Sequence, residues 1–173
     1  MDETLDKPHR SNLRLNRRMY APGCFFVTKA LEPRKKIVSA GMAEIISSTW
    51  TFYAEKQEIY LAAFAVMLDH WHVLFATGPQ TMLPARLQAA DRWIGGHTNR
   101  ELADSNCHWE DGYHDTRIRS SKQFRHVRRY IENNPVAAGL AQCAEEWLWS
   151  SANPRYRPFI TNLWPWRFEQ DPM

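Results

Sequence analysis

Apolar and polar positions follow strand and helix periods in turn along the first half of the chain. Residues 23–31 (GCFFVTKAL) are mostly apolar between turn-forming residues and predict a strand. Residues 38–53 place apolar side chains at helical spacing and predict an amphipathic helix. Residues 58–77 predict a hairpin of two apolar strands, with Asp69 near its turn. The order so far is strand, helix, strand, strand.

The second half continues the alternation. Residues 82–103 resume a helical pattern, which we expect to be interrupted by the pair Gly95 and Gly96. Those glycines do not form a phosphate-binding loop, because no GKS or GKT follows them. Residues 109–118 predict a fourth strand with a bend at Gly112.

A basic helix follows this strand. Its expected N-cap is Ser120 or Ser121, since apolar residues then recur at helical spacing. Its expected end is Asn133 or Asn134, because Pro135 disfavours the helical conformation in the residue before it.

The resulting order, β-α-β-β-α-β-α, is what an antiparallel sheet with helices packed on one side produces. The simplest architecture is a ferredoxin-like α+β fold. We divide the chain into a basic N-terminal arm (residues 1–19), a folded domain (residues 20–146) and a C-terminal segment rich in Trp, Pro and Arg (residues 147–173). The last segment has no clear periodicity, and it either wraps the domain or becomes ordered on binding.

Composition limits the class of protein. A chain of 173 residues with 44% hydrophobic content can form one domain with a sizeable core. Its longest apolar run is too short to cross a bilayer, and its first residues lack the apolar core of a signal peptide, so we expect a cytosolic protein. Three widely spaced cysteines without a CxxC motif argue against a disulfide framework and a structural zinc site.

Positive charge is clustered, although the net charge of +3 is modest. One cluster occupies the N-terminal arm and the other occupies residues 117–129. Such clustering suggests a polyanionic partner, and a solvated helix face is the alternative. The basic residues that we expect to contact phosphates are Arg14, Arg17, Arg18, Arg117, Arg119, Lys122, Arg125, Arg128 and Arg129.

Two histidines one residue apart lie in the most strand-like part of the chain. Side chains alternate between the faces of a strand, so His70 and His72 point the same way, about 6.5 to 7 Å apart at the backbone. Trp71 and Val73 then fall on the opposite face, where they can pack. The histidines are a candidate pair of metal ligands, but taken alone a His-x-His pair on a strand is more often structural or simply exposed.

Tyr130 and Asn134 are four residues apart at the end of the basic helix, so they share one face if the helix extends that far. A tyrosine hydroxyl can act as a nucleophile toward a phosphodiester, and an amide oxygen can ligate a hard cation. The alternative is that Tyr130 packs and Asn134 only ends the helix.

Four ordered segments, DHWHVLF, WEDGYHDTRIR, YIENNPVAAGL and EEWLWSS, resemble the successive blocks of the REP-associated tyrosine transposases. These are IS200-like relatives of the single-tyrosine HUH transposases, which mobilise DNA as single strands. The resemblance covers about residues 20–151. It implies the ferredoxin-like HUH endonuclease fold, a divalent cation (Mg²⁺ or Mn²⁺), and a partner that is single-stranded DNA with hairpin-forming palindromic repeats. It also implies a bacterial cytoplasmic protein that acts at the nucleoid, as a monomer or a homodimer.

The resemblance assigns roles to four residues. His70 and His72 correspond to the HUH metal ligands, Asn134 to the third protein ligand and Tyr130 to the nucleophile that forms a 5′-phosphotyrosine. At position 137 this chain has alanine where the family pattern leads us to expect a basic residue, so one phosphate contact is missing.

Two other functions stay open on the sequence. One is a repeat-specific DNA-binding protein without cleavage activity, and the other is a metal-dependent hydrolase that uses activated water.

Trp164 and Trp166, beside Arg167, are candidates for stacking on unpaired bases.

Overall fold

A computed structural model describes residues 23–77, 83–161 and 168. The predicted N-terminal arm with Arg14, Arg17 and Arg18 lies outside the described residues, as do Trp164, Trp166 and Arg167. The elements are β1 (Cys24–Glu32), α1 (Ala40–Glu55), β2 (Ile59–Val66), β3 (His70–Thr77), α2 (Leu83–Asp104), β4 (His108–Trp109), β5 (His114–Ile118), α3 (Ser121–Ala137) and two 3₁₀ turns, η1 (Ala144–Glu146) and η2 (Pro154–Phe159).

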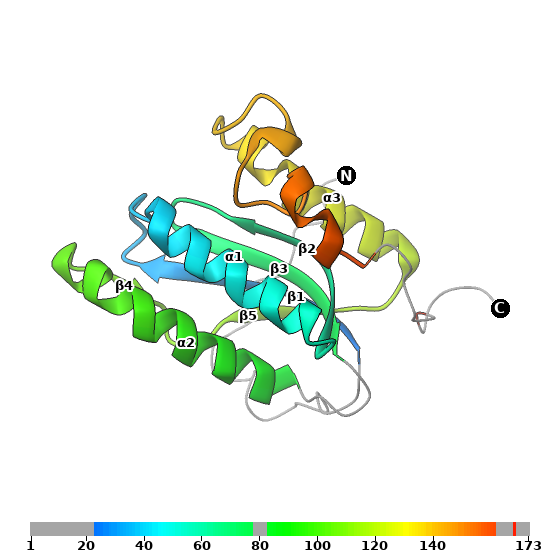
Figure 1. Ribbon diagram of the computed structural model, residues 1–173, viewed down its shortest axis with the longest axis horizontal. Coiled ribbons are helices and arrows are strands. Elements are labelled where there is room, and N and C mark those ends of the chain that lie inside the picture. The colour runs from blue at the N-terminus through cyan, green and yellow to red at the C-terminus, as the bar shows by residue number, and fades with distance from the viewer. Residues whose placement is uncertain (1–22, 78–82, 162–167, 169–173) are drawn as a thin grey trace, which may run out of the picture.

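The strands form one antiparallel sheet of five, in the order β2-β3-β1-β4, with β5 also paired to β1 (Figure 1). This is the predicted ferredoxin-like arrangement, which is confirmed. The expected single strand over residues 109–118 is two strands instead. β4 pairs with the end of β1 at Leu31, and β5 pairs with the beginning of β1 up to Thr28. The four residues 110–113 therefore connect the two strands opposite only two residues of β1, and this interrupts the pairing. Gly112 takes a φ of +87° in this connection.

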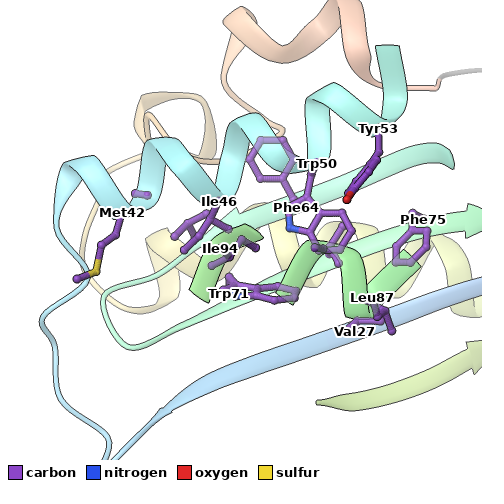
Figure 2. Packing of buried hydrophobic residues seen from close by; sticks show 14 of the residues in the cluster. Val27, Met42, Ile46, Trp50, Tyr53, Phe64, Trp71, Phe75, Leu87 and Ile94 are labelled. Carbon is purple, nitrogen blue, oxygen red and sulfur yellow. The ribbon is translucent and has the colours of Figure 1, made fainter. Parts of the chain in front are cut away.

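Helices α1 and α2 cover one face of the sheet (Figure 1). Alternation along β3 turns Trp71, Val73 and Phe75 toward them, and the rings of Trp71 and Phe75 meet that of Trp50 from α1 (Figure 2). The centroid of the Trp50 ring lies 5.3 Å from that of Trp71. This aromatic core makes β3 the rigid centre of the domain.

The expectation that all helices pack on one side is wrong, because α3 packs on the opposite face. Its apolar stripe buries Ile131 completely and sets Phe124 and Val127 against small residues of β2 and β3. The third helix is amphipathic and therefore buries its apolar stripe on the face that α1 and α2 leave uncovered. The histidines of β3 point to this second face.

The two glycines of α2 do not interrupt the helix. Each costs roughly 1 kcal/mol relative to alanine in a helix interior. Burial of Ile94, Thr98 and Leu102 along the inner face of α2 holds the helix together through this stretch.

The predicted end of α3 at Asn133 or Asn134 is also wrong. The helix continues through Pro135, which is buried, and ends at Ala137. A proline near the last turn removes only one backbone donor, and the bonds that follow it are intact: Ala138 N donates to Asn134 O (2.9 Å) and Leu140 N to Pro135 O (2.8 Å). Tyr130 and Asn134 therefore both lie inside the helix and share a face.

The segment after α3 closes the free edge of β2. The Ser151 amide donates to Phe64 O and the Thr161 amide to Leu61 O, both at 2.8 Å. In return Val66 N donates to Trp149 O at 2.8 Å. Within the described residues, no helix is both long enough and apolar enough to cross a membrane.

Candidate active site

The histidine pair lies on the face of the sheet that α3 covers in part. Both side chains point the same way, as the alternation along β3 predicted, and His70 Nε2 lies 3.1 Å from His72 Nε2. The pair is sheltered: His72 is 5% exposed and the His70 side chain is 18% exposed. Two imidazole nitrogens therefore converge on one point beside the central strands.

A polar neighbour fixes the second nitrogen of each ring. His70 Nδ1 donates to Asp69 Oδ1 at 2.6 Å, and Asp69 in turn lies 3.5 Å from an Arg34 nitrogen. His72 Nδ1 lies 2.7 Å from Thr28 Oγ1 on β1. When both rings are neutral and Nδ1 is the donor in each, both Nε2 lone pairs can bind a cation. Such partners of metal-binding histidines set the orientation and basicity of the ligand.

The charges at this site differ between the two rings. Burial, together with the positive charges of His70 and Arg34, lowers the pKa of His72 to about 3. Burial acts to raise the pKa of Asp69, but its hydrogen bond and charge interaction with His70 outweigh this and hold it below the ordinary value. His72 is thus neutral at physiological pH, next to an ionised Asp69.

Helix α3 brings Tyr130 to the histidines. Its ring centroid lies 5.5 Å from that of His72 and 6.1 Å from that of Phe26, against which it packs edge to face. The side chain is 49% exposed, so its hydroxyl is open to a substrate. Asn134 is half-buried one turn further along the same side of α3.

The donor set fits a divalent cation of octahedral geometry. Adjacent ligands of such an ion, with bonds of about 2.1 Å, lie about 3.0 Å apart. The separation of 3.1 Å between the two Nε2 atoms is close to this value. In the part of the chain that the structure describes, no three His, Cys, Asp or Glu side chains are grouped to hold a metal ion. A cation here would take its further ligands from Asn134, water or substrate oxygens.

The predicted phosphate contacts are divided between the two faces. Arg117 lies on the face of α1 and α2, with its guanidinium carbon 6.0 Å from the centroid of the Phe25 ring. It is thus on the opposite side of the sheet from His72. Arg119 is exposed at the start of α3.

The basic residues of α3 also differ among themselves. Lys122, Arg125 and Arg129 are exposed. Arg128 is half-buried and forms an ion pair of 3.2 Å with Glu132. Consecutive residues on a helix diverge by about 100°, so Arg128 and Arg129 point in different directions, and Arg129 is the one without an ion pair within the described residues.

Three neighbours of the site were not singled out as site residues by their positions in the sequence. Thr28 contacts His72 from a strand that carries no recognisable motif. Asp69 was noted only for its place near the turn, although it binds His70. His114, directly opposite Thr28 in the sheet, lies on the same face, and its Nε2 is 3.8 Å from Glu110 Oε2. Asp69 could have been recognised from the sequence as a partner of the histidines, because its carboxylate is adjacent to the His-x-His motif.

Comparison with known proteins agrees with this geometry. The family model for IS200-like transposases matches residues 25–134, which include both histidines, Tyr130 and Asn134. No curated protein matches the chain. Among solved structures, the chain is similar to a REP-associated tyrosine transposase bound to a REP hairpin, with a TM-score of 0.65 and 19% identity over 90% of this chain and 92% of the other. It is also similar to a "putative transposase" from Deinococcus radiodurans, with a TM-score of 0.48 and 18% identity over 74% of this chain and 97% of that one.

The fold and the sequence match together define a DNA-processing protein of the transposase class. Within that class, the chain belongs to the IS200-like transposase family. The family predicted from the four ordered segments is therefore confirmed, and the structural similarity extends the agreement in fold to a REP-associated member.

Proposed function

We propose that this protein is a metal-dependent single-stranded DNA endonuclease and strand transferase that acts at palindromic, REP-type repeats through a 5′-phosphotyrosine intermediate. The observation that carries the proposal is the position of Tyr130. Its exposed ring lies 5.5 Å from the ring of His72, beside two imidazole nitrogens that converge on one point. A DNA-binding protein that does not cut has no need of a nucleophile next to a cation site.

In this proposal the side chains have the following roles. The Tyr130 oxygen forms a bond to the scissile phosphorus while the bond from phosphorus to the 3′ oxygen breaks. The phenol proton is lost and the departing 3′ oxygen gains one, which leaves a 3′ hydroxyl on one fragment and a 5′ phosphate on the tyrosine. Attack by a 3′ hydroxyl on that phosphotyrosine rejoins strands, and the energy of the ester bond is conserved.

His70, His72 and Asn134 would hold Mg²⁺ or Mn²⁺. When bound, such an ion polarises a nonbridging phosphate oxygen and neutralises the charge that develops on it. Asp69 and Thr28 keep the two imidazoles in the orientation that presents Nε2. Packing against Phe26 limits the directions that the Tyr130 ring can take.

Single-stranded DNA with a hairpin is the substrate that we propose. The solved relative of similar fold is bound to a REP hairpin. In this chain, exposed cations line the outer side of α3, and they can bind the phosphates that flank the bond to be cut. The nearest of them to Tyr130 in sequence is Arg129.

The test is a cleavage assay with labelled single-stranded oligonucleotides that carry the palindromic repeats flanking the gene. After incubation with Mg²⁺ or Mn²⁺, denaturing electrophoresis should show a shortened strand and a slowly migrating covalent adduct. Tyr130→Phe should abolish both products and retain DNA binding. The control is Tyr60→Phe, which removes a hydroxyl from a half-buried tyrosine on the same face of the sheet and should leave both products in place.

Two outcomes would replace this proposal. DNA binding without any cut or adduct, across several metals, assigns the protein as a repeat-binding protein. A cut strand without an adduct, produced equally by Tyr130→Phe, assigns it as a hydrolase that uses activated water.

A further inference from the structure

A cavity of about 460 Å³ lies on the other side of the sheet from the histidines, between α2 and the segment that follows it. Its apolar wall includes Ile94 and Trp109, both buried. The indole nitrogen of Trp109 donates to Thr98 Oγ1 at 2.9 Å, so that wall is held in place. Neither the metal site nor Tyr130 contributes to this cavity.

One glycine of α2 lines this space. Gly95 lies in the cavity wall, and the nearest atoms that a Cβ built there would meet belong to the side chain of Asn99, at 3.3 Å and beyond. Gly96 does not line it, and a Cβ there meets nothing within 4 Å. Glycine inside a helix has a cost in stability, so a glycine that opens a lined cavity points to a bound group rather than to the needs of the helix.

The polar wall carries one ammonium and two carboxylates. Lys29 Nζ lies 2.8 Å from Asp91 Oδ2, and their side chains are 10% and 25% exposed. Glu110 Oε1 accepts from the amide of Ala30 at 3.2 Å. An ammonium has three donor hydrogens and each carboxylate has two oxygens, so all three groups keep hydrogen-bonding capacity for a ligand. Burial raises the pKa of Asp91, although the charge and hydrogen bond of Lys29 act against this.

We infer that this cavity binds an unpaired guanine of the DNA strand. Guanine is the base whose edge combines an acceptor, O6, with two adjacent donors, N1–H and the 2-amino group. Lys29 matches the acceptor, and Asp91 and Glu110 match the donors. Ile94 and Trp109 supply the apolar part of the lining, which suits the ring of a base that has left its stack.

The inference rests on the proposed function for its source of DNA. The side chain of Glu110 lies between the cavity and the edge of the sheet beside the proposed active site. One of its oxygens lies 3.8 Å from His114 Nε2, and His114 stands opposite Thr28, the partner of His72. Glu110 therefore marks the side of the cavity from which a strand bound at the proposed active site would approach.

The test compares two neighbouring substitutions by fluorescence anisotropy. The probes are labelled twelve-residue oligonucleotides of thymidine alone and of thymidine with one central deoxyguanosine, deoxyadenosine, deoxycytidine or deoxyinosine. The wild-type protein should bind the guanine probe about tenfold more tightly than the thymidine probe, as expected for a well-paired base contact. Inosine, which lacks the 2-amino group, should lose part of this gain.

Gly95→Leu should fill the cavity and abolish the preference, whereas Gly96→Leu should keep it. Both changes raise helix propensity equally, and melting temperatures verify that both variants fold. Equal affinity of the wild type for all probes, a preference for another base, or a preference that survives in Gly95→Leu would overturn the inference. The cleavage assay tests the proposed function separately. If the adduct forms but guanine is not preferred, the proposed function stands and guanine binding in the cavity is rejected. If guanine is preferred but no adduct forms, only guanine binding in the cavity stands.

Discussion

His70 Nε2 lies 3.1 Å from His72 Nε2, and both rings are oriented through their other nitrogens by Asp69 and Thr28. At this separation one Nε2 can donate a hydrogen to the other, or both lone pairs can face a bound cation. Burial lowers the pKa of His72 to about 3, so His72 itself does not carry the positive charge at neutral pH. The pair is therefore suited to hold the cation that the proposed function requires.

The partner of His72 leads to the first prediction. Thr28→Val keeps the shape of the side chain and removes the oxygen that holds the His72 ring. We expect the affinity for Mn²⁺ to fall about tenfold, which is the lower end of the effect of such partners on metal binding. Free Mn²⁺, measured by electron paramagnetic resonance during a titration, checks this.

The matched control for this change is Thr116→Val. Thr116 lies on the same face of the sheet, opposite Phe26, and is exposed. Its replacement should leave Mn²⁺ affinity unchanged. An equal loss in both variants would show that the effect of Thr28 is not specific to His72.

The second prediction concerns acid stability of the metal-free protein. The pKa of His72 is about 3 in the folded state and ordinarily about 6.5, so the unfolded state binds more protons between these values. The stability that His72 contributes is present above pH 6.5 and is lost as the pH falls. Each pH unit in this window is worth up to about 1.4 kcal/mol, so roughly 3 kcal/mol should be lost by pH 4.

Urea unfolding at a series of pH values in the presence of a chelator measures this loss. His72→Asn removes the titrating group, so its free energy of unfolding should fall less steeply between pH 6.5 and 4. Asp69 contributes little to the loss of stability between pH 6.5 and 4, because its pKa is lowered and its carboxylate becomes protonated only at lower pH. Parallel curves for the two proteins would contradict the assignment of this loss to His72.

Much of the site could be predicted from the sequence because it depends on local periods. Alternation along one strand places His70 and His72 on one face, and a spacing of four on a helix places Tyr130 and Asn134 together. The end of α3 could not be predicted by the rule for residues before proline, since burial of Pro135 and the bonds around it outweigh that preference.

Contacts between distant segments were beyond local rules. Thr28 lies 44 positions from His72, and Lys29 lies 62 positions from Asp91. No period or motif marks these pairs, because each is made by the register of the sheet or the docking of α2. The cavity beside Gly95 also depends on contacts between distant segments. The sequence contains the two glycines, but it does not indicate that one of them lines a cavity.

The third prediction separates two consecutive arginines. Arg129 is exposed, whereas Arg128 pairs with Glu132 at 3.2 Å. Arg129→Gln should weaken binding of single-stranded DNA and reduce the slope of log Kd against log salt by about 0.7, the value for one phosphate contact. Arg128→Gln, the matched control, should change this slope little, because its charge is already neutralised. Equal slopes for both variants would argue against a phosphate contact by Arg129.

The fourth prediction concerns the segment that closes the sheet edge. Trp147 Nε1 donates to Val66 O at 2.8 Å, and its ring packs edge to face on Trp149. Trp147→Phe leaves that carbonyl without this donor and should lower the free energy of unfolding by about 1 kcal/mol or more. Leu148→Ala, at a side chain that is 51% exposed, should change it by less than about 0.5 kcal/mol. If chemical denaturation shows this difference, the chain beyond α3 is part of the cooperative domain that positions Tyr130; if Trp147→Phe is as stable as the wild type, the segment is an appendage that docks without supporting the sheet.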